Sequence, residues 1–300
     1  MDKDKLFHDK SREILTRTFK EIISFCEDNN LTYWATGGTM LGAIRHHGYI
    51  PWDDDVDIRM PWSDYCKLLD LYHSKGNPKY KIVSFKNRGY YYAHSKFVDS
   101  ETTLWEYWSR PFVSGVFVDI IPYFLSNDNE KEIEIKYEKY SDAYKKYVRT
   151  TYYYDLYSLY NSLIRGEFKM IFGFLRSKLF YRNAENYYKE YVNQLTSLNC
   201  DDGDKYVLYI AGDSSIMKKK WSIMNREWLD RQIEVPFEDF KVKIPVGYDH
   251  FLKFFYGEYM KLPPEDKRYS IHPVIYENLK EGLSIEEVKQ RLKLGEYKVY

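Results

Sequence analysis

Residues 37–60 read GGTMLGAIRHHGYIPWDDDVDIRM, and the prediction of the fold starts from this stretch. Two glycines open it, and four aspartates follow close behind, at Asp53, Asp54, Asp55 and Asp57. Carboxylates this close together repel one another, so a positive group is expected among them. That group could be a lysine, counterions in water or a bound metal ion, and the rest of the chain has to decide among the three.

The residues on either side of the two glycines predict a strand, a turn and a helix. Residues 31–36 have the pattern of a short strand that runs into Gly37 and Gly38, and residues 39–47 that of a short helix closed by Gly48. Such a turn leaves backbone N–H groups and the Thr39 hydroxyl at a helix N-terminus, which suits phosphate. The side chains expected to neutralise the rest of a diphosphate are Arg45, His46, His47 and Lys96.

The aspartates continue into a second predicted strand, residues 55–60. Side chains alternate along a strand, so Asp53, Asp55 and Asp57 face one way. Successive members of this set, two residues apart in sequence, lie about 7 Å apart along the strand. Asp119 lies inside an otherwise apolar strand, residues 116–121, which Pro122 is expected to end. An aspartate in that setting is costly unless it is paired or binds a metal ion. It is therefore the expected third carboxylate of a divalent-cation site.

Two less specific interpretations of the acidic stretch compete with a metal site. A calcium-binding loop would need glycine where Ile58 stands, and it prefers glutamate where Asp64 stands. A solvated acidic turn is common for three successive aspartates. The strand, turn and helix before the stretch and Asp119 after it favour metal-assisted phosphoryl transfer instead.

The rest of the chain predicts an α/β front third, a helical middle and a mixed tail. Helices are expected over residues 9–28, from Pro61 onwards, over most of the tyrosine-rich residues 129–199, and at 249–259 and 284–294. Strands are expected at 80–85, 90–98, 102–107 and 235–245. In the helical middle, a stripe of tyrosines at helical spacing consists of Tyr137, Tyr140, Tyr144 and Tyr147. Such a stripe is more often a packing surface than a cage for a quaternary ammonium group, so a packing surface is expected here.

Composition excludes several classes of protein. Lys plus Arg equals Asp plus Glu at 45 each, so no overall positive field would attract nucleic acid. The three cysteines lack metal-ligand spacing, which predicts neither a zinc site nor a disulfide framework. With no signal peptide and no apolar run of about 20 residues, the expected location is the cytoplasm. Residues 166–182, apolar with basic residues interspersed, fit either a peripheral contact with an anionic membrane or a core helix.

The stretch at 37–58 closely resembles the signature of the LicD family of phosphocholine transferases, whose distant relatives include fukutin and fukutin-related protein. Three further stretches are similar to that family: KFVDSETT at 96–103, VFVDIIPYF at 116–124 and residues 235–268. The resemblance implies an α/β (α+β) fold with a nucleotidyltransferase-like mixed-sheet core. It gives three expected parts: a catalytic core at 1–127, a helical segment at 128–200 and a C-terminal segment at 201–300 packed on the core.

The resemblance also assigns roles to individual residues. Gly37 and Gly38 match the family's turn, Asp55 and Asp57 its carboxylate pair, and Asp119 its third carboxylate. These three aspartates would hold Mg²⁺ (or Mn²⁺), and Asp119 or Asp53 would accept a proton. The residues expected to bind substrate are Gly37, Gly38, Thr39, Arg45, His46, Lys96 and His272.

The activity that the resemblance implies is transfer of a phosphoalcohol, typically phosphocholine from CDP-choline or a related group from another CDP-alcohol. The acceptor would be a sugar hydroxyl of a cell-surface glycan, such as lipopolysaccharide or teichoic acid, or its lipid-linked precursor. Two alternatives use the same residues. One is a nucleotidyltransferase that takes a nucleoside triphosphate and releases diphosphate, and the other is a non-catalytic glycan-binding relative.

Overall fold

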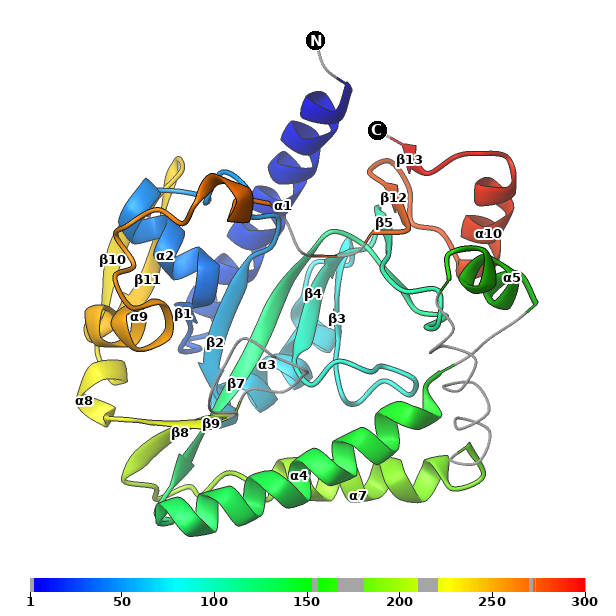
Figure 1. Ribbon diagram of the computed structural model, residues 1–300. Coiled ribbons are helices and arrows are strands. Elements are labelled where there is room, and N and C mark those ends of the chain that lie inside the picture. The colour runs from blue at the N-terminus through cyan, green and yellow to red at the C-terminus, as the bar shows by residue number, and fades with distance from the viewer. Residues whose placement is uncertain are drawn as a thin grey trace.

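The computed structural model describes residues 3–152, 156–166, 181–209, 221–269, 272 and 274–299. Its centre is a mixed sheet in the order β1-β2-β7-β4-β3 (Figure 1). These strands are β1 (Trp34–Ala35), β2 (Asp57–Pro61), β3 (Tyr80–Val83), β4 (Ser95–Asp99) and β7 (Phe117–Ser126). β2 and β7 are parallel and the other neighbours antiparallel, which confirms the predicted mixed α+β class.

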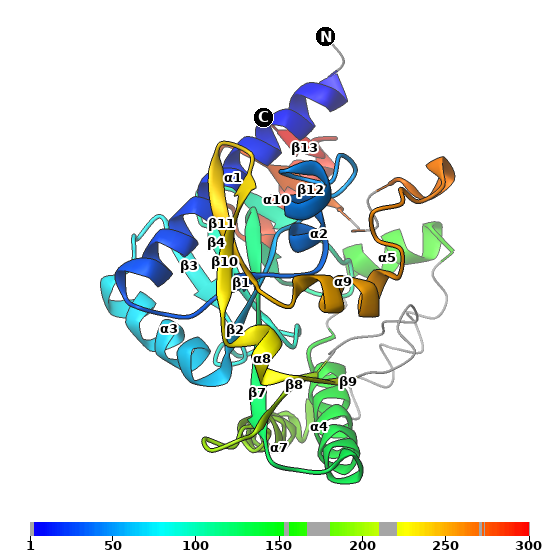
Figure 2. The same ribbon diagram turned by 90° about the vertical axis from the view of Figure 1, so that its left-hand side faces the viewer.

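Two helices cover one face of this sheet and leave the other face for the candidate site. They are α1 (Lys3–Asp28) and α3 (Trp62–Lys75), and Figure 2 shows both on the side away from α9 (Tyr248–Tyr256). The α1/α3 face is apolar: Phe97 of β4 meets Tyr72 of α3, and Ile58 and Ile120 are fully buried beside it. Because side chains alternate, Asp57, Lys96 and Asp119 must point to the opposite face.

The long strand β7 corrects one prediction, because Pro122 lies inside it and does not end it. The Asp119 N–H donates to the carbonyl of Val56, the residue before β2, so alternation turns the backbone of Pro122 to the other edge of β7. On that edge, pairing with β4 ends at Ile120, and pairing with β8 (Lys205–Tyr209) begins at Phe124. Proline is tolerated at this position since no partner strand requires its missing N–H.

Two other local predictions were wrong. Tyr90–His94 was expected to be part of a strand, but β4 begins only at Ser95. Tyr90 and Tyr91 are buried against Phe112 instead, and the Tyr91 carbonyl accepts a hydrogen bond from Tyr144. Gly48 was expected to close α2 (Gly37–His46), but His47 takes the left-handed conformation there, with φ 57°.

The helical middle segment packs mainly through its tyrosines. α4 (Glu130–Thr150) starts with a capping box between Asn129 and Glu132 and lies along α7 (Ala184–Thr196). Tyr147 stacks on Tyr191, and Tyr140 also meets that ring. These buried rings form a packing surface between the two helices, as expected for the stripe. α5 (Leu156–Ile164) follows α4, and most of the amphipathic stretch 166–182 lies outside the described residues.

The C-terminal third returns to the core in three places. β8 and β9 (Trp221–Met224) extend the sheet from β7. The hairpin β10 (Gln232–Phe237) and β11 (Phe240–Pro245) follows the short helix α8 (Arg226–Leu229) and packs near α2 and β1. A second sheet, β13-β12-β5-β6, joins Lys298–Val299 and Tyr276–Asn278 to Thr103–Trp105 and Val113–Ser114. Within the described ranges the remaining helices are the 3₁₀ turn Glu265–Lys267 and α10 (Ile285–Lys293). The boundaries at 127 and 200 remain predictions.

Candidate active site

Three carboxylates meet at the N-terminal ends of β2 and β7. Asp57 and Asp119 pair directly across the two parallel strands, so their side chains leave the same face of the sheet. Asp55, two residues before Asp57, completes the group, and oxygen atoms of the three carboxylates lie within 4.8 Å of one another. Carboxylate oxygens at this spacing are suitable ligands for Mg²⁺ or Mn²⁺.

The N-terminus of α2 packs against these carboxylates, and its sequence explains how. Gly37 has φ +56°, and a Cβ there would lie 2.9 Å from Asp57 Oδ2. A Cβ on Gly38 would lie only 2.2 Å from Asp53 Oδ2. The two glycines therefore let carboxylates approach the positive end of the helix. The Thr39 hydroxyl is buried and accepts a hydrogen bond of 2.9 Å from the Asp57 N–H, so it positions β2.

Electrostatics set Asp119 apart from the other carboxylates. Burial raises the pKa of Asp57 to about 7, and repulsion from Asp119 adds to the increase. Burial, with repulsion from Asp57 and Asp53, also raises the pKa of Asp55 well above its usual range. Burial would raise the pKa of Asp119 as well, but His94 and Lys96 lower it overall. Repulsion among these buried carboxylates favours the binding of protons, and a divalent cation could replace those protons.

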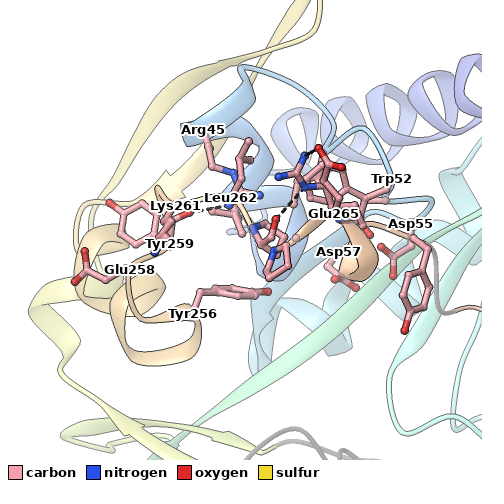
Figure 3. Close-up of a pocket in the computed structure, with 18 of the residues that line it drawn as sticks. Arg45, Trp52, Asp55, Asp57, Tyr256, Glu258, Tyr259, Lys261, Leu262 and Glu265 are labelled. Atoms are coloured by element: carbon pink, nitrogen blue, oxygen red, sulfur yellow. Dashed lines mark hydrogen bonds and ion pairs between the residues drawn. The ribbon is translucent and has the colours of Figure 1, made fainter.

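A cavity of about 980 Å³ opens from the carboxylates towards α9 and the segment that follows it (Figure 3). Its acidic side is formed by Asp53, Asp55 and Asp57. Basic and aromatic side chains form much of the rest; they are Arg45, Trp52, Tyr256, Tyr259, Lys261, Arg268 and Tyr269. Acidic, basic and aromatic groups in one cavity suit a ligand that carries a metal-bound diphosphate and a ring.

Residues 30–161 match the family model of the LicD/FKTN/FKRP nucleotidyltransferase domain. The matched stretch contains Asp55, Asp57 and Asp119. It is 28% identical over 261 residues to lipopolysaccharide cholinephosphotransferase LicD of Haemophilus influenzae, covering 83% of this chain and 89% of that protein. It is 43% identical over 57 residues to human ribitol 5-phosphate transferase FKRP, covering 18% of this chain and 12% of that protein. An uncharacterised protein of Rickettsia typhi is 34% identical over 82 residues, 27% of this chain and 23% of its own length.

Two of the basic residues that were expected at the site, Arg45 and His46, differ in their contact with the cavity. Arg45 lines the cavity, and its Nη1 donates a 2.8 Å hydrogen bond to the Tyr259 carbonyl. His46 accepts a 2.9 Å hydrogen bond from Arg45 Nε and packs edge-on against Trp52. His46 is not among the described residues that line the cavity, so its contact with the site runs through Arg45 and Trp52.

Lys96 lies behind Asp119, on the adjacent strand, and is 1% exposed. Its Nζ lies 3.6 Å from Asp119 Oδ1 and 3.7 Å from Glu106 Oε2, and it sits over the Phe117 and Tyr92 rings. A side chain enclosed in this way compensates the charge of Asp119 and Glu106. It is placed to orient a carboxylate, and its burial does not favour the predicted direct contact with substrate.

The C-terminal segment brings His272 to the acidic stretch. Its Nδ1 lies 2.7 Å from Asp54 Oδ1, and its Nε2 lies 3.4 Å from Asp55 Oδ2. The hydrogen bond with Asp54 is the main reason that the pKa of His272 rises to about 9. The imidazolium therefore supplies one of the positive groups that the run of aspartates requires.

Two charged side chains that lie next to the cluster, His94 and Glu106, were not predicted from the sequence. His94 Nε2 lies 3.2 Å from Asp119 Oδ1, and Glu106 faces Lys96. His94 precedes Lys96 by two residues and so shares its strand face, which is the signal that could have identified it. Arg59 is also buried, 7% exposed, with Nε and Nη1 lacking hydrogen-bond partners. It lies two residues beyond Asp57 on the same face, and burial lowers the pKa of its guanidinium to about 10.

The lengths and apolar content of the helices are relevant to whether one of them could cross a membrane. Among the helices in the described part of the chain, none is both long and apolar enough to cross a bilayer.

Proposed function

We propose that this chain is a metal-dependent phosphotransferase that moves phosphocholine from CDP-choline onto a sugar hydroxyl of a cell-surface glycan or its lipid-linked precursor. We place this reaction in the cytoplasm, at or near the inner face of the membrane. The observation that carries the proposal is the meeting of Asp55, Asp57 and Asp119 within 4.8 Å at the edge of a large cavity, inside the stretch that matches the LicD/FKTN/FKRP family model.

The choice of alcohol rests on the relatives. The protein named a cholinephosphotransferase aligns over 83% of this chain, whereas the one named a ribitol 5-phosphate transferase aligns over 18%. Phosphocholine is therefore the first group to test, and phosphoribitol the second. The acceptor follows from the same relative, whose name places its product on lipopolysaccharide.

The metal site and the basic side chains would bind different oxygen atoms of the donor diphosphate. Asp55, Asp57 and Asp119 would hold Mg²⁺ or Mn²⁺, which when bound neutralises diphosphate oxygens and lowers the pKa of an attacking hydroxyl. Arg45 and Arg268 line the same cavity and would bind the remaining phosphate oxygens. The closely packed N-terminus of α2 adds the partial positive charge of its free N–H groups.

The proton of the attacking hydroxyl needs an acceptor, and two carboxylates are candidates. The pKa of Asp119 is lowered by His94 and Lys96 despite burial, so it is a weak base. Burial raises the pKa of Asp53, which makes Asp53 the stronger base of the two. We therefore assign proton removal to Asp53 and metal binding to Asp119.

The test is release of CMP from CDP-choline in the presence of Mg²⁺, with CDP-ribitol and CDP-glycerol as further donors and CTP as the substrate of the alternative. Asp57→Asn should lower the rate by at least about 100-fold, because a metal ligand is lost. Its melting temperature should stay within about 5 °C, since the change relieves repulsion among buried carboxylates. Asp142→Asn, on the surface of α4 in an ion pair with Lys146, is the matched control and should keep full activity.

Diphosphate release from CTP without CMP release from any CDP-alcohol would make the nucleotidyltransferase alternative correct. Absence of Mg²⁺ and Mn²⁺ binding would favour the non-catalytic alternative. Unfolding of Asp57→Asn at room temperature would show that this aspartate is structural.

A further inference from the structure

A second cavity, of about 520 Å³, adjoins the catalytic carboxylates. Asp55 and His272 line both this cavity and the larger one. The two cavities therefore meet at the carboxylate cluster. A transfer reaction needs two substrates to reach one reacting phosphorus from different sides, and two cavities that share a catalytic carboxylate provide such an arrangement.

Three elements from distant parts of the chain build the walls of the second cavity. One face of α1 contributes His8, Ser11 and Leu15, which follow the spacing of a single helical face. A cross-strand row in the second sheet contributes Leu104 of β5, Glu277 of β12 and Lys298 of β13, which are paired in register. The beginning of β7 and the residues before it contribute Val116 and Phe117, while Glu106 lies beside them.

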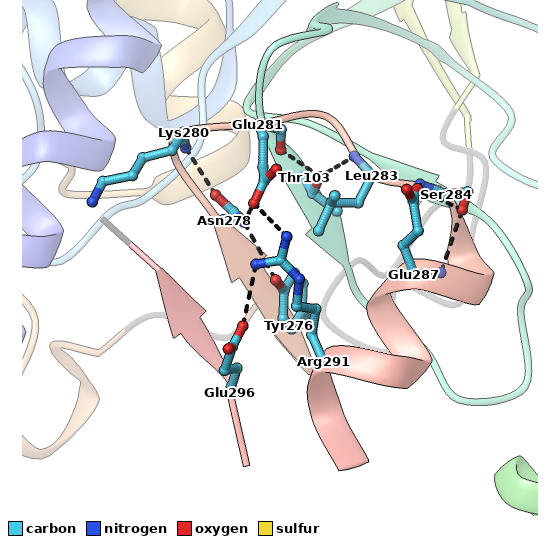
Figure 4. Close-up of polar contacts among 10 residues, drawn as sticks. All are labelled: Thr103, Tyr276, Asn278, Lys280, Glu281, Leu283, Ser284, Glu287, Arg291 and Glu296. Atoms are coloured by element: carbon cyan, nitrogen blue, oxygen red, sulfur yellow. Dashed lines mark hydrogen bonds and ion pairs between the residues drawn. The ribbon is translucent and has the colours of Figure 1, made fainter. Parts of the chain in front are cut away.

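Hydrogen bonds hold the β12 wall in place (Figure 4). Thr103 of β5 donates to the Glu281 carbonyl at 2.8 Å and accepts from the Leu283 N–H at 2.7 Å. Arg291 of α10 donates to Glu281 at 2.8 Å and to Glu296 at 3.3 Å. These bonds fix the segment after β12 against both β5 and α10. Glu277 is therefore presented by a preorganised strand, which favours a binding role.

The second cavity differs chemically from the larger one. Its polar lining contains four carboxylates, those of Asp54, Asp55, Glu106 and Glu277, against one lysine, Lys298, and two histidines, His8 and His272; no arginine is among the described residues that line it. Carboxylates accept hydrogen bonds from hydroxyl groups and repel phosphate. Leu15, Leu104 and Phe117 add apolar surface of the kind that covers the C–H faces of a sugar ring. This lining suits a neutral polyhydroxylated ligand and disfavours a nucleotide.

We propose that this second cavity, between α1 and the β5–β12–β13 sheet, binds the acceptor sugar; the assignment rests on the function proposed above. In that arrangement the sugar hydroxyl oxygen bonds to the phosphorus that carries the alcohol. The bond from this phosphorus to the bridging oxygen of the diphosphate breaks, and CMP leaves with that oxygen. The hydroxyl proton passes to Asp53, the base assigned above, which lines the larger cavity together with Asp55. Glu277 and Ser11, joined by a 3.0 Å hydrogen bond, position the ring and do not take part in bond breaking.

The experiment fills the second cavity and leaves the first one open. Of the two cavities, Val274 lines the second and not the first, and it is 43% exposed, so Val274→Trp should fold and occupy the space. The control is Ile135→Trp on α4, which enlarges a side chain that is 44% exposed. The probes are the methyl glycosides of glucose, galactose, N-acetylglucosamine and N-acetylgalactosamine, observed by saturation-transfer NMR. Donor binding is measured by calorimetry with Mg²⁺ and CDP-choline, CDP-ribitol or CDP-glycerol.

Wild type and Ile135→Trp should both show saturation transfer to at least one glycoside, and Val274→Trp should reduce it by at least about fivefold. Donor affinity of Val274→Trp should remain within about twofold of wild type. Glu277→Gln, which keeps the shape and the Ser11 contact, should weaken the glycoside signal by about three- to tenfold, because a carboxylate acceptor is stronger than an amide.

Unchanged glycoside binding in both Val274→Trp and Glu277→Gln would overturn the assignment, as would no signal from any of the four glycosides in wild type. A parallel loss of donor affinity in Val274→Trp would overturn the separation of the two cavities. Glycoside binding that depends on Val274 and Glu277, with no binding of any CDP-alcohol, would support the sugar cavity and contradict the proposed function. The two proposals can thus fail separately.

Discussion

Asp57 and Asp119 are register partners in the one parallel strand pair of the described main sheet, and Lys96 is the register partner of Asp119 on its other side. One carboxylate thus stands between another carboxylate and a buried cation in a single row across three strands. The two aspartates differ in pKa because burial and repulsion from Asp119 raise the pKa of Asp57, whereas His94 and then Lys96 lower that of Asp119. This difference underlies the first two predictions.

Affinity for Mg²⁺ should depend on pH through Asp57. Its pKa of about 7, raised first by burial and then by Asp119, means that a proton competes with the cation below neutral pH. Affinity should rise as pH increases from about 5.5 to 7, by up to about tenfold per pH unit for each proton displaced, and then level off. Calorimetry over this range, in two buffers of different ionisation enthalpy, measures both affinity and proton release. A pH-independent affinity would contradict the assignment of Asp57 as a ligand.

Replacing Lys96 by methionine should destabilise the fold. The change removes the buried cation 3.6 Å from Asp119 and 3.7 Å from Glu106 while keeping a side chain of similar length. Leaving buried carboxylates without their cation typically costs about 3–5 kcal/mol of unfolding free energy. Urea unfolding measures the loss. Lys146→Met, which breaks a surface pair with Asp142, should lose less than about 1 kcal/mol. Equal effects of the two variants would show that Lys96 does not compensate the buried charges.

The substitution Gly38→Ala, which adds one methyl group, should impair catalysis more than stability. The new Cβ would lie 2.2 Å from Asp53 Oδ2, so the flexible carboxylate must move away from the N-terminus of α2. We expect the kcat of CMP release to fall by about tenfold or more, because the assigned base is displaced. Stability should change by less than about 1 kcal/mol, because alanine suits a helix better than glycine does.

Gly89→Ala is the matched control for this effect. Gly89 has φ +85° and no atom within 4 Å of the position of a Cβ, so the variant should lose about 1 kcal/mol of stability and keep its kcat. Activity and thermal unfolding of both variants test the contrast. A Gly38→Ala protein with the full kcat would argue against Asp53 as the base.

Glu277 should make the folded state less stable as pH rises. Burial raises its pKa from 4.5 to about 7. Between these values the folded chain binds the proton that the unfolded chain has released, so unfolding free energy falls with increasing pH, by up to about 1.4 kcal/mol per unit. Glu277→Gln should remove this slope and become more stable than wild type near pH 8. The exposed Glu286→Gln is the control. Parallel stability curves for wild type and Glu277→Gln from pH 4 to 8 would contradict the prediction.

The sequence predicted the mixed class of the fold and the resemblance to the family because both follow from local sequence patterns. A Gly-Gly turn before a helix and alternating aspartates on a strand follow from residues that are neighbours in the chain. Asp119 stood out for a similar reason, since an acidic residue within an apolar strand requires a partner. The predictions for Pro122 and Tyr90–His94 were wrong because the local sequence does not indicate which strands or helices would pack against these segments.

The sequence by itself determined the three carboxylates, the two glycines and the element types that present them, because short-range periodicity dictates which face each side chain occupies. Only the tertiary structure decided their surroundings. Strand register enclosed Lys96 behind Asp119 and set His94 beside it, and the return of the C-terminal segment carried His272 to Asp54 over a separation of 218 residues. The pairing of β12 with β5 also created the second cavity. Contacts between segments this far apart depend on how the strands pair and pack, and a local sequence pattern does not predict such pairing.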